Sequence, residues 1–180
     1  MKRLIITLTV LGLISALVLS SVYQWTKPKI DQHEREKQKK AIMTVLQESD
    51  DYNEVKKEGK VFFEGNRLGE IAYEISGAGY SGQIKMMIGF IPAEDKITAI
   101  QILNHSETPG LGANIETNNF RSNFKDKKFG EYQVVKRKVE NPSRSLDVEA
   151  ISGATISSKS VTRLVEKAVE DVQKYYGGEG

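Results

Sequence analysis

The hydrophobic residues of this chain are distributed in three successive patterns, and the first is an uncharged run. This run extends from Leu4 to Tyr23 and is rich in Leu, Ile and Val. Its length matches the roughly 20 residues that a helix needs to cross a bilayer. A cleaved signal peptide is the rival interpretation, but its apolar core usually has about 7–15 residues, and no clear Ala-x-Ala site follows the run. The pattern therefore predicts an uncleaved transmembrane helix over residues 4–23.

The charges beside this run indicate its orientation. Lys2 and Arg3 precede the run, which favours a cytoplasmic N-terminus by the positive-inside rule. Lys27 and Lys29 follow the run and weaken that bias. The sequence predicts a single-pass protein of the cell inner (cytoplasmic) membrane, with its C-terminal domain on the extracytoplasmic side.

The second pattern is a charged, helix-prone segment from Ile30 to about Glu48. Its mixed charges predict a solvated helix, and Ile42, Val45 and Leu46 form an apolar stripe near its end. The chain is thereby divided into an N-terminal anchor over residues 1–26, a helical stalk over 27–50 and a folded domain over 51–180.

Beyond Asp51 the pattern changes to short apolar runs separated by turns, which predicts strands. Gly77, Gly79 and Gly82 surround Tyr80 and Ser81, as expected of a hairpin connection. Because the spacings are short, the strands are expected to pair antiparallel. The predicted strands are Val61–Phe63, Leu68–Ile75, Ile84–Phe90, Ile97–Leu103 and Tyr132–Val139.

Helical periodicity returns at the end of the chain. A final helix is expected from Ser157 or Ser158 to Tyr176, with either serine as its N-cap and Gly177-Gly178 ending it. The fold class is therefore α+β, an antiparallel sheet with flanking helices preceded by one transmembrane helix. The expected buried face of the last helix comprises Val161, Leu164, Val165, Ala168, Val169, Val172 and Tyr176.

Composition and motifs exclude several functions. The chain has no cysteine, so disulfides, thiolate metal sites and Cys-ligated clusters are excluded. His33 and His105 lack metal-ligand spacing, so no metal site is expected. Lys2 and Arg3 account for the formal net charge of +2, which gives no reason to expect nucleic acid as a partner. No nucleophile–base pair, P-loop or dinucleotide-binding motif is present, so no catalytic residue is predicted.

The small residues Ile151-Ser152-Gly153-Ala154-Thr155-Ile156-Ser157-Ser158 lie between a strand-like run and the last helix. A helix start carries unpaired N–H groups and the positive end of the helix dipole, which together favour an anion. A hydroxyl at such a position can bind a phosphate or be esterified by one.

Residues Ser152–Thr155 of this stretch resemble the flavinylation motif of FMN-binding domains. These domains occur in the G subunit of the ion-translocating Rnf complex (ferredoxin:NAD oxidoreductase) and in the C subunit of the Na⁺-translocating NADH:quinone reductase. The loop Glu107-Thr108-Pro109-Gly110-Leu111-Gly112 is similar to the second signature loop of the family. The likeness extends from the anchor to the final helix, and the compact length is closer to the Rnf protein.

The resemblance implies that FMN is attached covalently, as a phosphoester, to Thr155. A separate flavin transferase makes this bond from FAD outside the cytoplasm. The family usually has Asp six residues before the modified Thr, and Glu149 stands there in this chain. Lys138 is an alternative to Lys136, because the sequence does not fix the length of the turn that follows. The implied cofactor-binding residues are Glu107, Thr108, Gly110, Leu111, Lys136, Ser152, Gly153, Ala154 and Ile156.

The function implied by the resemblance is electron transfer within a membrane-bound ion-translocating ferredoxin:NAD oxidoreductase. The chain would pass electrons between the other membrane subunits of the Rnf complex and would not be a complete enzyme alone. Two alternatives stay open: a stand-alone extracytoplasmic flavinylated electron carrier, and a membrane-anchored binding module without a cofactor.

Overall fold

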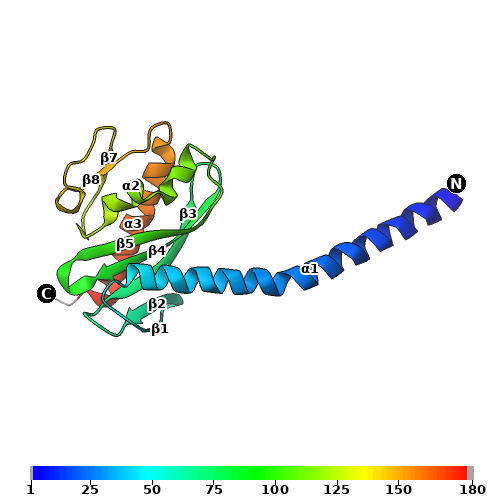
Figure 1. Ribbon diagram of the computed structural model, residues 1–180, viewed down its shortest axis with the longest axis horizontal. Helices are drawn as coiled ribbons and strands as arrows, with labels where there is room; N and C mark the ends of the chain where they lie inside the picture. Colours follow the sequence, from blue (N-terminus) through cyan, green and yellow to red (C-terminus); the bar gives the residue numbers. More distant parts are fainter. Residues whose placement is uncertain (1, 178–180) are drawn as a thin grey trace. The chain divides into compact units, whose positions relative to one another are not determined.

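The structure, a computed structural model, describes residues 2–177. Met1 of the predicted anchor and residues 178–180 of the predicted domain, including the helix-ending Gly178, lie outside the described residues. The chain forms two compact units, Met1–Lys37 and Gln38–Gly180. The first unit is helical and belongs to α1 (Lys2–Val45), the longest element in Figure 1.

The apolar run of α1 has the surface that a membrane helix needs. Its large side chains are exposed, with Leu8 at 69% and Leu19 at 72% of their area. The hydroxyls of Thr7 and Thr9 donate to carbonyls one turn earlier, so these polar groups are satisfied within the helix. The helix is long and apolar enough to cross a membrane by length and composition. The predicted apolar N-terminal helix is confirmed.

Within the described residues, the second unit is built on a six-stranded antiparallel sheet in the order β1-β2-β3-β4-β5-β6. The centre of the sheet is the β3–β4 hairpin, in which Tyr73 lies opposite Ile88 and Ile75 opposite Met86. Its glycine-rich connection agrees with the sequence prediction. The strands are β1 (Tyr52–Lys57), β2 (Lys60–Gly65), β3 (Ile71–Ala78), β4 (Gln83–Ile91), β5 (Lys96–His105) and β6 (Lys127–Lys128).

A second, two-stranded sheet is parallel, unlike the pairing expected throughout the domain. It joins β7 (Gln133–Val135) to β8 (Asp147–Glu149). The chain between them, residues 136–146, is long enough to return to the same end, as a parallel pair requires. The shorter helices are η1 (Pro92–Glu94), η2 (Gly112–Glu116), α2 (Asn118–Arg121), η3 (Ser122–Phe124) and η4 (Pro142–Arg144).

Several predicted boundaries differ from the structure. The strand expected from Leu68 begins at Ile71, because Leu68 and Gly69 adopt positive φ and form a turn. The strand expected over Tyr132–Val139 is reduced to β7. The last helix, α3 (Thr155–Tyr176), begins before either serine expected to cap it, and Ala154 is its N-cap.

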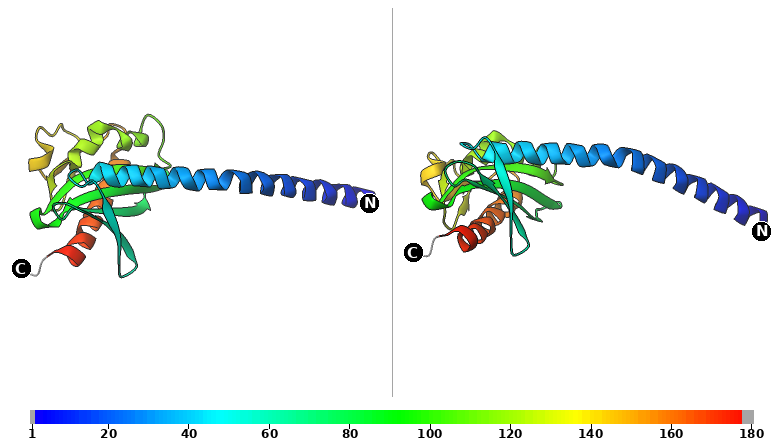
Figure 2. Two further views of the ribbon diagram at one scale, coloured as in Figure 1. Left: turned by 60° about the horizontal axis from the view of Figure 1, so that its bottom comes forward. Right: turned by 90° about the horizontal axis from the view of Figure 1, so that it is seen from below.

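The sheet is covered on both faces (Figure 2), by α3 (orange to red) on one and by the last turns of α1 (cyan) on the other. Successive side chains of β4 point to opposite faces of the sheet, so they belong to two separate hydrophobic cores. Met86 and Ile88 pack with Val165 of α3, whereas Met87 packs with Ile42 of α1. Each such buried side chain contributes about 1.5–3 kcal/mol relative to exposure. Packing on α3 therefore fixes where its N-terminus lies.

Glu70 holds the segment that directly follows α1. Its side chain is buried, and its carboxylate accepts hydrogen bonds from the N–H groups of Gln47 and Glu48 and from the Ser49 hydroxyl. The backbone donors just beyond the helix are thereby paired with a charged acceptor.

Glu70→Ala is expected to lower the free energy of unfolding by about 2–3 kcal/mol, because three donors lose their acceptor. Urea unfolding of the detergent-solubilised chain, followed by circular dichroism, measures this loss. The exposed Glu48 provides the control, and Glu48→Ala should change stability by less than about 0.5 kcal/mol. Equal losses in both variants would contradict the role given to Glu70.

Candidate functional site

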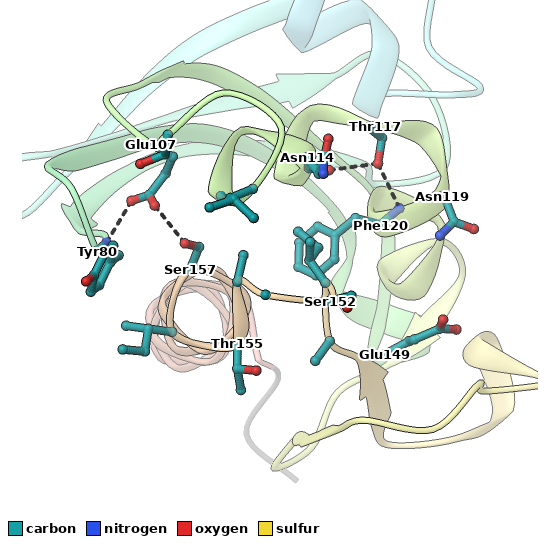
Figure 3. A pocket seen from close by; sticks show the side chains of 18 of the residues that line it. Tyr80, Glu107, Asn114, Thr117, Asn119, Phe120, Glu149, Ser152, Thr155 and Ser157 are labelled. Atoms are coloured by element: carbon teal, nitrogen blue, oxygen red, sulfur yellow. Dashed lines mark hydrogen bonds between the residues drawn. The ribbon is translucent and has the colours of Figure 1, made fainter.

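A cavity of about 1050 Å³ lies between the segment that follows β5 and the start of α3 (Figure 3). Its size is at the upper end of the roughly 300–1,000 Å³ typical of ligand sites. Both small-residue loops singled out in the sequence contribute to its wall. Every predicted site residue except Gly110 lines it, namely Glu107, Thr108, Leu111, Lys136, Glu149, Ser152, Gly153, Ala154, Thr155 and Ile156.

The cavity distinguishes the two lysines left open by the sequence. Lys136 lines it, whereas Lys138 lines a separate hollow of about 300 Å³ with Arg137 and Arg144. Lys136 follows β7 directly, and within residues 2–177 it makes no salt bridge. An exposed, unpaired ammonium group is thus available at the cavity wall.

The start of α3 carries the anion-binding features expected of a helix terminus. Thr155 is its first residue. The N-cap is Ala154, whose methyl side chain cannot accept a hydrogen bond from the first N–H groups of the helix. The first turn contains no acidic residue. Its backbone donors and the positive end of the dipole therefore lack an internal counter-charge from that turn.

The hydroxyl groups of the motif have different roles. Ser157 donates to Glu107 at 2.6 Å, and Ser158 accepts from the Ile151 N–H and donates to the Ala154 carbonyl. Both serines are buried. For Ser152 and Thr155, in contrast, no hydrogen bond of the hydroxyl is found among residues 2–177.

The position of Thr155 explains its free hydroxyl. Threonines inside helices of this chain, such as Thr44 and Thr162, donate to the carbonyl four residues earlier. Thr155 is the first helical residue, so the carbonyl four residues before it belongs to the preceding turn and accepts from the Ala154 N–H. The helix geometry leaves this hydroxyl available for chemistry.

The second loop is shaped by a turn at Pro109-Gly110. Gly110 has φ of 75°, and the Leu111 N–H donates to the Thr108 carbonyl, as in a turn that needs glycine at its third position. Gly110 itself is outside the cavity lining, so its part is to shape the loop. Leu111 then lies against Gly153, where an added Cβ would come within 3.1 Å of the leucine side chain. The two loops are in direct contact.

Glu107 is the residue that connects these elements. Its carboxylate accepts hydrogen bonds from the Tyr80 N–H, at 2.7 Å, and from the Ser157 hydroxyl (Figure 3). It also accepts one from the Ser81 N–H. Burial raises the pKa of this carboxyl, but the hydrogen bonds from Ser157, Tyr80 and Ser81 outweigh burial, so the pKa lies below its ordinary value. Glu107 therefore joins the β3–β4 turn to the first turn of α3.

Sequence reasoning missed part of the cavity wall, and several of the missed residues are polar and come from the short helices after the loop. Thr117 caps α2 by accepting from the Phe120 N–H, and Asn123 accepts from the Glu149 N–H at 2.9 Å. The available signal was the Thr-Asn-Asn-Phe run, a capped helix start beside a glycine-rich loop. The lining residues outside both small-residue loops are Tyr80, Asn114, Thr117, Asn119, Phe120, Asn123 and Ala150, whereas Gly112, Ile151 and Ser157 lie within those loops but were not among the predicted binding residues.

Comparison with known proteins identifies the family. The FMN-binding domain matches residues 79–170, which include both loops and most of α3. The chain belongs to the FMN-binding domain family. The G subunit of the proton-translocating ferredoxin:NAD⁺ oxidoreductase complex of Clostridium ljungdahlii is 37% identical over 175 residues, covering 95% of this chain and 91% of that protein.

The chain is also similar to a second G subunit and to a solved structure. The G subunit of the ion-translocating oxidoreductase complex of Methanosarcina acetivorans is 31% identical, covering 97% of this chain and 96% of that protein. The crystal structure of the C subunit of Na⁺-translocating NADH-quinone reductase from Parabacteroides distasonis is similar with a TM-score of 0.56 and 27% identity, covering 67% of this chain and 64% of that protein. The predicted fold class and the family resemblance are confirmed.

The lowered pKa of Glu107 predicts a pH-dependent stability. A carboxyl whose pKa is lowered by folding stabilises the protein above its unfolded pKa of about 4.3, and this contribution is lost as the pH falls through the folded pKa. At pH 7, Glu107→Gln should therefore cost about 1–3 kcal/mol. The deficit should shrink as the pH falls below about 4.3.

Urea midpoints of the full chain between pH 7 and pH 3 measure this deficit. Glu131→Gln, at an exposed carboxylate, is the control and should differ from the parent by less than about 0.5 kcal/mol throughout. A deficit for Glu107→Gln that stays constant over this range would contradict the assignment.

Proposed function

We propose that this chain is the electron-transfer subunit of a membrane-bound ion-translocating ferredoxin:NAD oxidoreductase of the Rnf type, with FMN linked through a phosphoester to Thr155. The observation that carries the proposal is the free Thr155 hydroxyl at an uncapped helix start, inside a cavity lined by both family loops. Family membership and the two G-subunit relatives support the same function.

The residues present suit a phosphorylated flavin. The N–H groups at the start of α3 and the ammonium of Lys136 supply positive charge for a phosphate at Thr155. Leu111, exposed for 46% of its area, offers an apolar surface to a ring. The flavin supplies the redox chemistry when bound, and the chain supplies attachment, orientation and electrostatics.

Attachment requires a defined exchange of bonds. The Thr155 oxygen forms a bond to the FMN phosphorus of FAD, the pyrophosphate bond of FAD breaks, AMP leaves and the hydroxyl proton is released. Among the described residues, no side chain forms a hydrogen bond with the Thr155 hydroxyl through which it could take up that proton, which accords with a separate flavin transferase. Glu149 lines the cavity six residues before Thr155, where that enzyme would recognise it.

The proposed assembly places the flavin outside the cytoplasm. The apolar helix anchors the chain to the inner membrane, and the other membrane subunits of the complex exchange electrons with the domain. We retain the division into anchor (1–26), stalk (27–50) and FMN-binding domain (51–180) as part of this proposal. The end of the stalk packs on the sheet through Ala41, Ile42, Val45 and Leu46.

Thr155→Val is expected to abolish covalent flavin, because valine has nearly the same shape and lacks the oxygen. The full chain is co-expressed with a flavin transferase, and in-gel fluorescence after denaturing electrophoresis detects any flavin that survives denaturation. Thr108→Val, Thr117→Val and Ser152→Ala remove the exposed serine and threonine hydroxyls of the cavity wall and should keep a fluorescent band.

An unmodified chain without fluorescence in the presence of an active transferase would refute covalent attachment and favour the cofactor-free module. A band that persists in Thr155→Val and disappears in one of the control variants would move the attachment to that hydroxyl.

Orientation is tested separately with alkaline phosphatase fused after Gly180, since this reporter is active only outside the cytoplasm. High activity is expected from the positive charge of Lys2 and Arg3 before the apolar run. A fused reporter that is active only in the cytoplasm should be silent. The opposite pair of results would reverse the proposed orientation.

A further inference from the structure

The fold contains a buried carboxylate whose surroundings are built for negative charge. Glu107 is 5% exposed, and its three hydrogen-bond partners, Tyr80 N–H, Ser81 N–H and the Ser157 hydroxyl, all donate. An ionised carboxylate only accepts, so this set of partners selects the charged form. The lowered pKa of the group agrees with this geometry.

Two glycines make room for this carboxylate. A Cβ added to Gly79 would collide with one oxygen of Glu107, and a Cβ added to Gly112 would collide with the other. The backbone on both sides thus approaches closer than any side chain would permit.

No lysine or arginine within residues 2–177 forms a salt bridge with Glu107. The basic group beside it is His105, whose Nδ1 accepts the Glu107 N–H at 3.0 Å. The Nε2 atom of the same ring faces Glu116 at 3.3 Å. His105 adds to the lowering of the Glu107 pKa, but less than the hydrogen bonds from Ser157, Tyr80 and Ser81 do, so N–H and O–H dipoles are the main compensation for this charge.

Glu107 also differs from the other charged groups of the cavity wall. Lys136 is exposed and Glu149 is partly exposed, so solvent and salt screen both. The field of a buried charge is screened less and extends further into the cavity.

We propose that Glu107 is a fixed negative charge that lowers the midpoint potential of the flavin held in this cavity. The inference rests on the proposed function, because it assumes the flavin. Adding an electron beside a buried anion is unfavourable by Coulomb's law, and nearby charge is a known means of tuning a bound flavin. Glu107 is thus a positioning residue through its hydrogen bonds and an electrostatic one through its charge.

The test is a spectroscopic redox titration of the flavin-loaded full chain in detergent at pH 7. Glu107→Gln removes the charge at nearly constant shape, and the midpoint potential should shift to a more positive value. Glu116→Gln is the matched control, because it also removes one carboxylate near His105. The Glu116 side chain is 50% exposed and lies outside the cavity. Its potential should stay within error of the parent.

Ser157→Ala provides the opposite perturbation and a second test if Glu107→Gln fails to load flavin. It keeps the charge and removes one of its donors, so the midpoint potential should shift to a more negative value. If the substitutions acted only by loosening the loop, the midpoint potentials of both variants would shift in the same direction.

The outcomes separate this inference from the proposed function. Loss of in-gel fluorescence from the unmodified chain would refute the proposed function. A fluorescent parent whose potential is unchanged in Glu107→Gln, or in Ser157→Ala where only that variant loads, would overturn the electrostatic role and leave the function intact. Shifts of equal sign in the two variants would also overturn it.

Discussion

The unpaired N–H groups at the start of α3 are the feature on which the rest of the site depends. A helix start without a capping side chain or an acidic first turn is stable only where water or a ligand pairs its donors. The packing of Val165 and its neighbours on the sheet holds this start in place. The two loops then complete a cavity around it, so the core of the domain serves to position a few backbone donors.

Within one short motif, the chain has hydroxyls that are buried and hydrogen-bonded and others for which no hydrogen bond is found among residues 2–177. Ser157 and Ser158 turn inward, where one joins Glu107 and the other closes the turn before the helix. Thr155 lies two residues before Ser157, which places it about 200° around the helix, away from Glu107. Figure 3 shows this difference in direction. A motif rich in hydroxyls thereby leaves few of them accessible, and the helical period decides which.

The sequence predicted the features that depend on local pattern. The apolar helix, the central hairpin, the buried face of α3 and both loops of the cavity all follow from residue type and spacing. What it missed depends on distant partners. β6 is two residues long and is a strand only because it pairs with β5. At the early start of α3, the Ile151 N–H of the preceding turn donates to the Ser158 hydroxyl, seven residues further along the chain. The buried role of Glu107 requires Tyr80 and Ser157, which lie 27 and 50 residues away.

An open cavity and a covalent bond suit each other in the proposed function. Tyr80, Leu111 and Ile156 line the cavity, and each is exposed for 46% or more of its area, so a ring beside them would stay accessible to a redox partner. The same exposure leaves less apolar surface to hold a cofactor that can dissociate. A tether at Thr155 makes the local flavin concentration independent of supply. Because the tether holds the flavin, flavin binding no longer depends on the charge of Glu107. That buried charge can then set the electrostatics of the site.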